Sequence, residues 1–269
     1  MGGRLSVFNK VMQPEDGAAW VTGASAGIGK AVALNLASRG WRVYATARGS
    51  EQLNALAAEA AGASGTIIAV PGDVTELQDM HAAVTRISAD GPLALAIFNA
   101  GVYKPMRAQT FSATDARQTF DVNLAGVTNG LEPVLAHMIE RQHGHIALVA
   151  SVAGYRGLPN AAAYSATKAG LIAMAEALAM DLVDLGVRIS VINPGFVETE
   201  ATSVNEFEMP MLLQPDDAAR RIVEGLRKPG FEIRFPWQFA AFLRLIGLLP
   251  NRAYIWAVRK TLGWDKLDN

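Results

Sequence analysis

The sequence contains no cysteine among its 269 residues. That absence excludes a disulfide scaffold, a thiolate zinc site, an iron–sulfur cluster and a cysteine nucleophile, so redox chemistry would require a bound cofactor. An excess of one charge is also missing, because 24 Lys and Arg side chains against 25 Asp and Glu give a net charge of −1. Proteins whose main task is binding nucleic acid carry a basic excess, so we expect no nucleic-acid partner.

Long uncharged apolar runs are lacking as well. Basic side chains break the most apolar region, 235–262, before it reaches about 20 uncharged residues, the length of a membrane span. The first 17 residues include charged side chains of both signs and no continuous apolar segment, unlike a secretory signal. We therefore expect a cytoplasmic protein without a membrane span.

The residues that are present favour an α/β fold. Hydrophobic residues make up 51% of the chain, and from residue 18 onward short apolar runs alternate with longer segments of helical periodicity. The predicted strands are 18–22, 42–46, 66–70, 93–98, 145–150, 188–192 and 232–235. The predicted helices are 28–38, 51–60, 77–88, 114–141, 164–185 and 215–227. This alternation is typical of a single doubly wound, Rossmann-type sheet of seven mostly parallel strands flanked by helices.

The predicted sheet divides the chain into three segments. Residues 1–17 form an N-terminal extension, 18–235 the sheet domain, and 236–269 a C-terminal extension with helical spacing. We find no internal repeat, low-complexity tract or Gly/Ser linker that would indicate a second domain.

A glycine-rich turn follows the first predicted strand. Residues 22–29 read Thr-Gly-Ala-Ser-Ala-Gly-Ile-Gly and lead into a helix. Glycines at such a turn let the chain reverse tightly and bring backbone N–H groups and a helix N-terminus against a pyrophosphate. A purely structural turn is the alternative that the loop alone leaves open.

Polar motifs follow the later strands. Asp-Val ends the third strand at 73–74, Asn-Ala-Gly ends the fourth at 99–101, Ser151 follows the fifth, and Pro-Gly-Phe-Val-Glu-Thr at 194–199 follows the sixth. Ligands of open parallel sheets bind outside the carboxyl ends of the strands, so we expect these motifs to meet there.

The loop and these motifs, in this order over 18–235, resemble the short-chain dehydrogenase/reductase family, in the subgroup with a TGxxxGxG loop and an Asn-Ser-Tyr-Lys tetrad. The resemblance implies an oxidoreductase that transfers a hydride between a nicotinamide cofactor and a carbonyl or secondary alcohol. The catalytic tetrad that it implies is Asn123, Ser151, Tyr164 and Lys168. The cofactor-binding residues that it implies are Thr22, Gly23, Ser25, Gly27, Ile28, Gly29, Arg48, Asp73, Val74, Asn99, Ala100, Gly101, Tyr164, Lys168, Pro194, Gly195 and Thr199.

The family also implies individual roles. Asp73 would contact the adenine amino group, Thr199 would meet the nicotinamide carboxamide, and Asn123 would hold a water that relays protons from Lys168 to solvent. Asn99-Ala100-Gly101 resembles the family's sheet-stabilising motif beside the cofactor.

The chemistry of the tetrad can be argued from its residue types. Tyr164 and Lys168 are four apart, so they share one helix face. A neighbouring ammonium and a positively charged nicotinamide favour the phenolate, so we expect a lowered pKa for Tyr164, which would act as acid in carbonyl reduction and as base in alcohol oxidation. Ser151 would hydrogen-bond the substrate oxygen as that oxygen gains negative charge. Each residue alone also fits a structural role.

Cofactor preference is decided at the end of the second predicted strand. An acidic residue there binds a ribose 2′-hydroxyl, whereas an arginine accommodates a 2′-phosphate. Ala47 occupies the position of the acid and Arg48 follows it, so we expect NADP(H) rather than NAD(H). Many NADP-preferring relatives carry a second basic residue in the glycine loop, where this chain has Ala26.

The segment after the Pro-Gly motif, 196–214, covers the substrate in this family. Its apolar side chains include Phe196, Val197, Phe207, Met209, Met211, Leu212 and Leu213. An apolar lid favours a hydrophobic ketone or aldehyde, and four glutamates in the same segment disfavour an anionic substrate. The alternative is that these residues only pack the lid on the protein.

The C-terminal extension is basic while the rest of the chain is acidic. Residues 234–269 hold six basic and two acidic side chains, a net charge of +4 that leaves −5 elsewhere. Apolar residues recur at helical spacing on both sides of Pro250: Phe239, Phe242, Leu243 and Ile246 on one face, then Ile255, Trp256, Val258 and Leu262. Three interpretations stay open for 238–262: peripheral contact with an anionic membrane, a cap over the active site, or a contact with a second subunit.

Two further expectations concern assembly and metals. Alanines line the helix predicted at 164–185, and family members usually associate through this helix, so we expect a homodimer or homotetramer. Three histidines, His137, His143 and His145, lack carboxylates at ligand spacing, so we predict no metal site.

Two other classes of function compete with an enzyme. One is a nucleotide-binding regulatory or scaffold protein without turnover, and the other is a peripheral membrane protein whose extension defines its task. The complete set of Asn, Ser, Tyr and Lys argues against the first, because binding alone needs neither a proton donor nor its ammonium partner.

Overall fold

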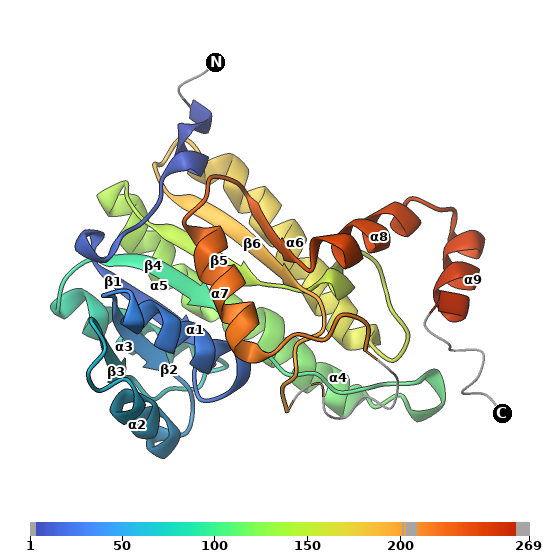
Figure 1. Cartoon of the computed structure of the whole chain (residues 1–269), viewed down its shortest axis with the longest axis horizontal. Helices are drawn as coiled ribbons and strands as arrows, with labels where there is room; N and C mark the ends of the chain where they lie inside the picture. Colours follow the sequence, from blue (N-terminus) through green and yellow to red (C-terminus); the bar gives the residue numbers. More distant parts are fainter. Residues whose placement is uncertain (1–3, 201, 203–208, 262–269) are drawn as a thin grey trace.

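The computed structural model describes residues 4–200, 202 and 209–261, and its centre is one seven-stranded sheet in the order β3-β2-β1-β4-β5-β6-β7 (Figure 1). The strands are β1 (Ala18–Thr22), β2 (Arg42–Thr46), β3 (Thr66–Ala69), β4 (Leu93–Phe98), β5 (His145–Val149), β6 (Arg188–Pro194) and β7 (Glu232–Phe235). Every neighbouring pair is parallel. The predicted doubly wound α/β fold is confirmed.

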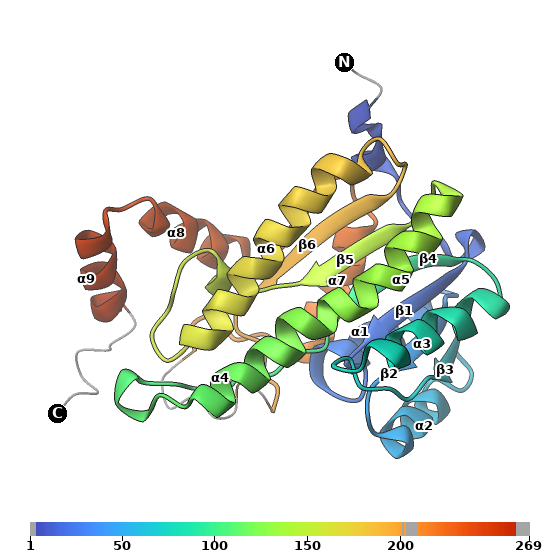
Figure 2. The same cartoon turned by 180° about the vertical axis from the view of Figure 1, so that it is seen from behind.

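Helices cover both faces of the sheet. They are α1 (Gly27–Ser38), α2 (Ser50–Glu59), α3 (Leu77–Ala89), α4 (Ala113–Phe120), α5 (Gly126–Arg141), α6 (Ala162–Leu182), α7 (Pro215–Leu226), α8 (Trp237–Gly247) and α9 (Asn251–Thr261). Helices α1 and α7 lie on one face (Figure 1), and α3, α5 and α6 lie on the other (Figure 2). The covered central strands β1 and β4 are therefore buried along their whole length and do not alternate between apolar and polar residues.

Two hydrophobic cores result, one on each face of the sheet. Successive side chains of a strand point to opposite faces, so Ala19 and Val21 of β1 pack into the core under α1 and α7, whereas Trp20 packs into the core under α3, α5 and α6. The indole of Trp20 meets Phe98 of β4 edge-on, with 5.7 Å between the ring centroids. The crossover helices thus fix the strands from both sides and hold their carboxyl ends in register.

The single helix expected at 114–141 is wrong in one respect. Helices α4 and α5 are separated by a π-helical turn, Asp121–Ala125, which contains Asn123. The Asn123 carboxamide accepts from the N–H of Val102 at 2.8 Å and donates to its carbonyl at 2.9 Å. This pairing joins the turn to the loop after β4, and π-helical turns inside α-helices are frequent at functional sites.

Helices α8 and α9, with residues 248–250 between them, form what we call the C-terminal arm (237–261), which extends beyond the body of the protein in both views (Figure 1, Figure 2). The expected apolar faces need correction. Phe239, Leu243 and Val258 are buried, but Phe242, Ile255 and Trp256 are exposed, because only one side of each helix rests on the protein. Leu262 lies outside the described residues. Among the described helices none is both long and apolar enough to cross a membrane.

Candidate active site

A cavity of about 1280 Å³ opens along the carboxyl ends of the strands, from the glycine loop to the start of α6. It brings together most of the residues predicted from the sequence: Gly23, Ser25, Gly27, Ile28, Arg48, Asp73, Val74, Asn99, Ala100, Gly101, Ser151, Tyr164, Lys168, Pro194, Gly195 and Thr199. Three predicted residues do not line it, namely Thr22, Gly29 and Asn123.

The glycine loop has the geometry of an anion cradle. Gly23 and Gly27 have φ angles of 66° and 54°, in the left-handed region that favours glycine. Helix α1 begins at Gly27, and its N-cap residue, Ala26, has no side chain that could accept from the first N–H groups. The first turn of α1 also holds no acidic side chain. A pyrophosphate fits this end of the cavity, because free N–H groups and the positive helix end favour an anion there.

Thr22 and Gly29 lie behind the cradle and shape it. The Thr22 hydroxyl accepts from the backbone N–H groups of Asn99 and Ala100 at 3.1 and 3.2 Å, and the Asn99 amide donates to the Thr22 and Gly23 carbonyls at 3.1 Å. A Cβ on Gly29 would lie 2.2 Å from the Gly23 carbonyl oxygen. The Thr22 hydroxyl therefore joins the ends of β1 and β4, and the missing side chain of Gly29 leaves room for the Gly23 carbonyl and the Asn99 amide.

The adenosine end of the cavity is bordered by β2 and β3. Arg48 is exposed at the rim, directly after Ala47, and both residues line the cavity. The Asp73 carboxylate accepts from the N–H and the hydroxyl of Thr75 at 2.9 and 2.8 Å, which fixes its direction. The fixed Asp73 carboxylate suits an adenine amino group, and the exposed Arg48 guanidinium suits an anionic substituent on the ribose.

Ser151, Tyr164 and Lys168 meet at the other end of the cavity. Ser151 follows β5, and its hydroxyl accepts from the Ala153 N–H at 3.1 Å. Tyr164 and Lys168 lie one turn apart near the start of α6, with the Lys168 Nζ 5.5 Å from the centroid of the Tyr164 ring. The Lys168 ammonium donates to the Val149 carbonyl at 2.7 Å. The end of β5 and the start of α6 thus place a hydroxyl, a phenol and an ammonium around the same end of the cavity.

Burial shifts the pKa values of both helix residues. It raises the pKa of Tyr164 to about 12, against the hydroxyl of Ser151, which acts to lower it. It lowers the pKa of Lys168 to about 8. The expected lowering for Tyr164 is therefore wrong for the protein alone, because loss of hydration outweighs the neighbouring groups. At neutral pH Tyr164 carries its proton and can donate it.

Asn123 is completely buried behind the cavity wall. Besides its two bonds to Val102, its amide donates to the Thr167 hydroxyl at 3.2 Å. Thr167 precedes Lys168, so the Asn123 side chain connects the π-helical turn to the part of α6 that carries the ammonium. Its polar atoms are occupied by these bonds, and it positions the site instead of facing it.

Tyr103 is a cavity residue that sequence reasoning missed. Its ring packs edge-on against Tyr164, with 5.1 Å between the centroids, and burial raises the pKa of its phenol. The available signal was its place two residues after Gly101, at the end of β4. It lines the cavity beside the Tyr164 ring.

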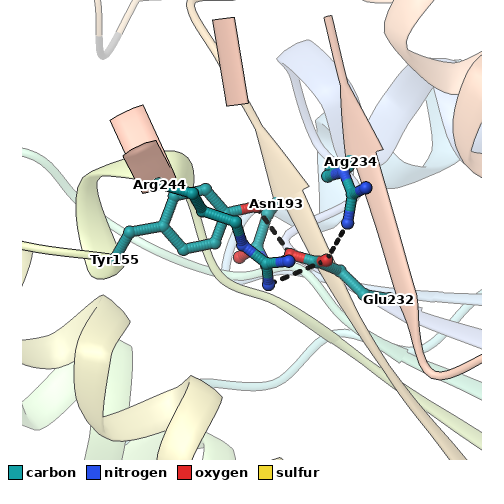
Figure 3. Close-up of polar contacts among 5 residues, drawn as sticks. All are labelled: Tyr155, Asn193, Glu232, Arg234 and Arg244. Atoms are coloured by element: carbon teal, nitrogen blue, oxygen red, sulfur yellow. Dashed lines mark hydrogen bonds and ion pairs between the residues drawn. The ribbon is translucent and has the colours of Figure 1, made fainter. Parts of the chain in front are cut away.

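A second missed feature is a polar cluster beside the cavity (Figure 3). Glu232 of β7 accepts from the Tyr155 hydroxyl at 2.6 Å and from the Asn193 amide at 2.7 Å, and its other oxygen pairs with Arg234 at 2.7 Å and Arg244 at 2.9 Å. Burial acts to raise the pKa of Glu232, but these four partners hold it below its usual value.

This Glu232 cluster connects three segments that border the site. Tyr155 lies in the loop after Ser151, Asn193 precedes Pro194, and Arg244 belongs to α8. The Arg244 guanidinium also lies over the Tyr155 ring, 4.8 Å from its centroid. The cluster thereby fixes the C-terminal arm to β7, to the end of β6 and to the loop after Ser151.

Comparison with known proteins agrees with this geometry. The family model described as short chain dehydrogenase matches residues 17–208. An uncharacterised oxidoreductase of Myxococcus xanthus is 41% identical over 90% of this chain and 96% of its own length. A 3-oxoacyl-[acyl-carrier-protein] reductase of Thermotoga maritima is 33% identical over 68% of this chain and 74% of its own length.

Solved structures show the same architecture. A variant of actinorhodin polyketide ketoreductase, solved with NADPH, superposes with a TM-score of 0.74 at 27% identity, covering 83% of this chain and 97% of its own. A 3-ketoacyl-ACP reductase from Sinorhizobium meliloti superposes with a TM-score of 0.70 at 28% identity, covering 81% of this chain and 96% of its own.

The chain belongs to the short-chain dehydrogenase/reductase family. It is an oxidoreductase of the class that interconverts CH–OH and C=O groups with a nicotinamide cofactor.

Proposed function

We propose that this protein is an NADP(H)-dependent carbonyl reductase, or alcohol dehydrogenase in the reverse direction, that acts on a hydrophobic ketone or aldehyde. The observation that carries the proposal is the single cavity with an anion cradle at one end and Ser151, Tyr164 and Lys168 at the other. A regulatory protein without turnover would need the cradle but not the buried ammonium beside a phenol, which costs stability because burial opposes its charge.

Each residue has a role that follows from its contacts. The bound nicotinamide cofactor would supply the hydride. Ser151 donates a hydrogen bond to the carbonyl oxygen of the substrate, and Tyr164 transfers its proton to that oxygen as negative charge develops. Lys168, held by the Val149 carbonyl, keeps a positive charge beside the phenol and stabilises the phenolate that remains. In alcohol oxidation the same proton returns to Tyr164.

The test of this mechanism is Tyr164→Phe. The substitution removes the proton donor and keeps the ring, so we expect carbonyl reduction to fall by about 10²–10⁴-fold while NADPH binding, followed by fluorescence, is retained. Tyr44→Phe is the matched control, because the Tyr44 hydroxyl bonds Asp90 at 2.7 Å and does not line the cavity. A Tyr164→Phe enzyme as fast as the wild type would overturn the proposal.

Arg48 supports the choice of NADP(H). It stands exposed at the cavity rim after β2, where Ala47 leaves no carboxylate to repel a 2′-phosphate. We expect NADPH to bind more tightly than NADH, and Arg48→Glu to reverse the order by losing the charge-assisted bonds to the phosphate. Fluorescence titration with both cofactors measures this, and equal losses for NADPH and NADH in the variant would contradict it.

Apolar side chains support a hydrophobic substrate. Val152, Leu158, Phe196 and Tyr103 line the cavity near Ser151 and Tyr164. Of the expected lid, Met211 and Leu212 are exposed, while Phe207 lies outside the described residues. We expect higher kcat/KM for medium-chain and aromatic carbonyls than for small polar ones, because burying apolar surface favours binding by about 25 cal/mol per Å². A preference for the small polar carbonyls would refute this part.

Helix α6 supports the expected homo-oligomer. Five alanines lie exposed along its outer face, Ala162, Ala166, Ala169, Ala173 and Ala177, and Met180 continues that face. Small side chains let a second helix approach closely, and an exposed methionine is typical of adaptable contacts. We propose that α6 contacts its counterpart in a second copy, and light scattering of the wild type against Ala173→Arg tests this.

A further inference from the structure

The C-terminal arm gathers exposed large apolar side chains. Within 237–261 the exposed ones are Trp237, Phe242, Leu245, Leu248, Leu249, Ile255 and Trp256, with exposed fractions of 37–83%. We call this set the arm face. The rest of the described chain is far longer than the arm. Its exposed large apolar side chains are only Leu77, Phe111, Phe120, Met180, Met211 and Leu212. Apolar surface concentrated in this way marks an interaction site.

The arm is held in place by its inner side. Phe239, Ala240 and Leu243 pack against Val152, with Leu158 and Phe196 beside them, so α8 forms the back of the cavity wall. Tyr254 of α9 donates to the Gly157 carbonyl at 2.8 Å. The arm face is therefore the side left over after the helices have packed, and it points away from the protein.

Cations accompany the apolar side chains on α9. Arg252, Trp256 and Lys260 follow one another at four-residue spacing, so they share a face, and all three are exposed. The Lys260 ammonium lies 5.4 Å from the centroid of the Trp256 ring. Aromatic rings flanked by long basic side chains suit a membrane interface, where the ring enters the headgroup region and the charge stays with the lipid phosphates.

The charge of the arm decides between two occupants. Residues 237–261 contain four basic side chains and no Asp or Glu. A two-fold contact between copies would bring the same patch against itself, so Arg252 and Lys260 would face like charges without a carboxylate from this segment. An anionic bilayer offers the apolar and the negative component together. The alanine face of α6 lacks this conflict.

We propose that the arm face is a docking surface for an anionic lipid membrane. The helices lie along the headgroup region with their apolar residues inserted, while the inner side of α8 keeps its place behind the cavity. This inference concerns the outer surface of the arm and does not depend on the substrate or cofactor proposed above.

Co-sedimentation of the full chain with vesicles tests the proposal. We expect binding to phosphatidylcholine vesicles that contain phosphatidylglycerol, weaker binding to phosphatidylcholine alone, and a loss of affinity as salt is raised, since the electrostatic part is screened. Absence of binding to the anionic vesicles at low salt would overturn the proposal.

Paired variants locate the surface. Arg252→Gln with Lys260→Gln should weaken binding about 25-fold, since each cation near an anionic surface contributes about fivefold. The matched control, Arg86→Gln with Arg141→Gln, removes the same charge from exposed positions on α3 and α5 and should change binding less than about twofold. An equal loss of vesicle binding in both double variants would mean that only the net charge of the protein matters, and it would contradict a specific binding surface on the arm.

Leu248→Gln with Trp256→Gln tests the apolar component. We expect vesicle binding to fall at least tenfold, whereas Leu77→Gln, at an exposed apolar site on α3, leaves it unchanged. Thermal unfolding and NADPH fluorescence confirm that each variant is folded. If the arm variants instead dissociate an oligomer without changing vesicle binding, the arm face is a subunit contact and the membrane proposal is wrong.

Discussion

The cofactor cradle and the C-terminal arm border the same cavity but are built differently. At the cradle, Thr22, Asn99 and Gly29 join backbone groups of β1, β4 and α1 at contact distance, and little space is left for change. At the arm, side chains from distant segments meet on Glu232 and Arg156, and the outer surface is open. The structure of the cradle therefore requires small residues at positions such as Gly29. The position of the arm requires contacts between long side chains.

The difference predicts how each region tolerates change. A cradle made of backbone recognises a part of the ligand that stays constant among relatives, because phosphate geometry does not vary. The arm is held by side chains whose partners lie on β6, on β7 and in the loops at 155–158, so its attachment depends on a few long side chains. The family model matches residues 17–208, a range that contains the cradle and not the arm.

The largest expected effect comes from adding a methyl group at Gly29 of the cradle, and the same change at Gly247 of the arm serves as its control. At Gly29 a Cβ would lie 2.2 Å from the Gly23 carbonyl oxygen and 2.4 Å from the Asn99 amide nitrogen, so backbone must move. We expect Gly29→Ala to lower the free energy of unfolding by about 1–3 kcal/mol and NADPH affinity by about two orders of magnitude.

Gly247→Ala is its matched control in α8. Nothing lies within 4 Å of the Cβ position, and a helical alanine is favoured over glycine, so we expect a gain of about 0.4–1 kcal/mol and unchanged NADPH affinity. Thermal unfolding and fluorescence titration measure both variants. Similar losses in the two would show that the arm is as closely constrained as the cradle, and the comparison would fail.

The second prediction uses the buried ammonium at the cavity. Because burial lowers the pKa of Lys168 to about 8 from 10.5, its positive charge is lost as pH rises through that value. We expect kcat/KM for carbonyl reduction to be constant at lower pH and to fall above about pH 8, by up to tenfold per pH unit. Tyr164 does not titrate there, since burial raises its pKa to about 12.

Lys168→Arg separates this cause from others, because a guanidinium keeps its charge throughout that range. The residual activity of the variant should lose the fall above pH 8. A pH profile that keeps the same fall in the variant would assign it to a different group and break the link between burial at α6 and catalysis.

Sequence patterns predicted the cradle side of the molecule well. Strand limits agreed within two residues, because strands covered on both faces are uninterrupted apolar runs such as Leu93–Phe98. Ser151, Tyr164 and Lys168 were placed correctly at the cavity, since strand ends and helix starts converge there by topology. Thr22, Gly29 and Asn123 lie one layer deeper than the cavity lining, and their contacts are to neighbours that the sequence does not identify.

The arm side shows what periodicity cannot supply. Helical spacing around Phe242 and Trp256 gave two apolar stripes, but not which stripe would rest on the protein. The Glu232 cluster joins residues 155, 193, 232 and 244, and no local pattern connects such distances. The π-helical turn at Asn123 likewise depends on a bond to Val102. The side-chain contacts between residues far apart in the sequence were therefore the part of the structure that sequence patterns could not predict.

The third prediction removes the negative charge at the base of the arm. Glu232→Gln keeps the shape of the side chain but replaces one acceptor oxygen with an amide group that donates, and it leaves Arg234 and Arg244 without their carboxylate. We expect the free energy of unfolding to fall by about 1–3 kcal/mol, because the carboxylate is 10% exposed and its bonds are charge-assisted. The substrate KM should rise severalfold while NADPH affinity stays unchanged.

Asp217→Asn is the control for Glu232→Gln, because Asp217 pairs with Arg220 at the surface and such pairs contribute about 0–1 kcal/mol. Denaturant unfolding and steady-state kinetics distinguish the two variants. If Glu232→Gln weakened NADPH binding as much as substrate binding, the arm would support the whole cavity and the division into two regions would have to be redrawn.

The smallest expected effect concerns the outer attachment of the arm. Arg156 donates to the Gly247 and Leu249 carbonyls at 2.7 Å and stacks on Tyr254 with its guanidinium 4.0 Å from the ring centroid. Lysine keeps the charge but loses the planar fork, so Arg156→Lys should loosen α9 locally with little change in overall stability. We expect amide hydrogen exchange in α9 to accelerate about tenfold and exchange in α1 to stay the same. Equal acceleration in α1 would mean that the arm and the cradle unfold as one cooperative unit, so their different construction would not give them separate stabilities.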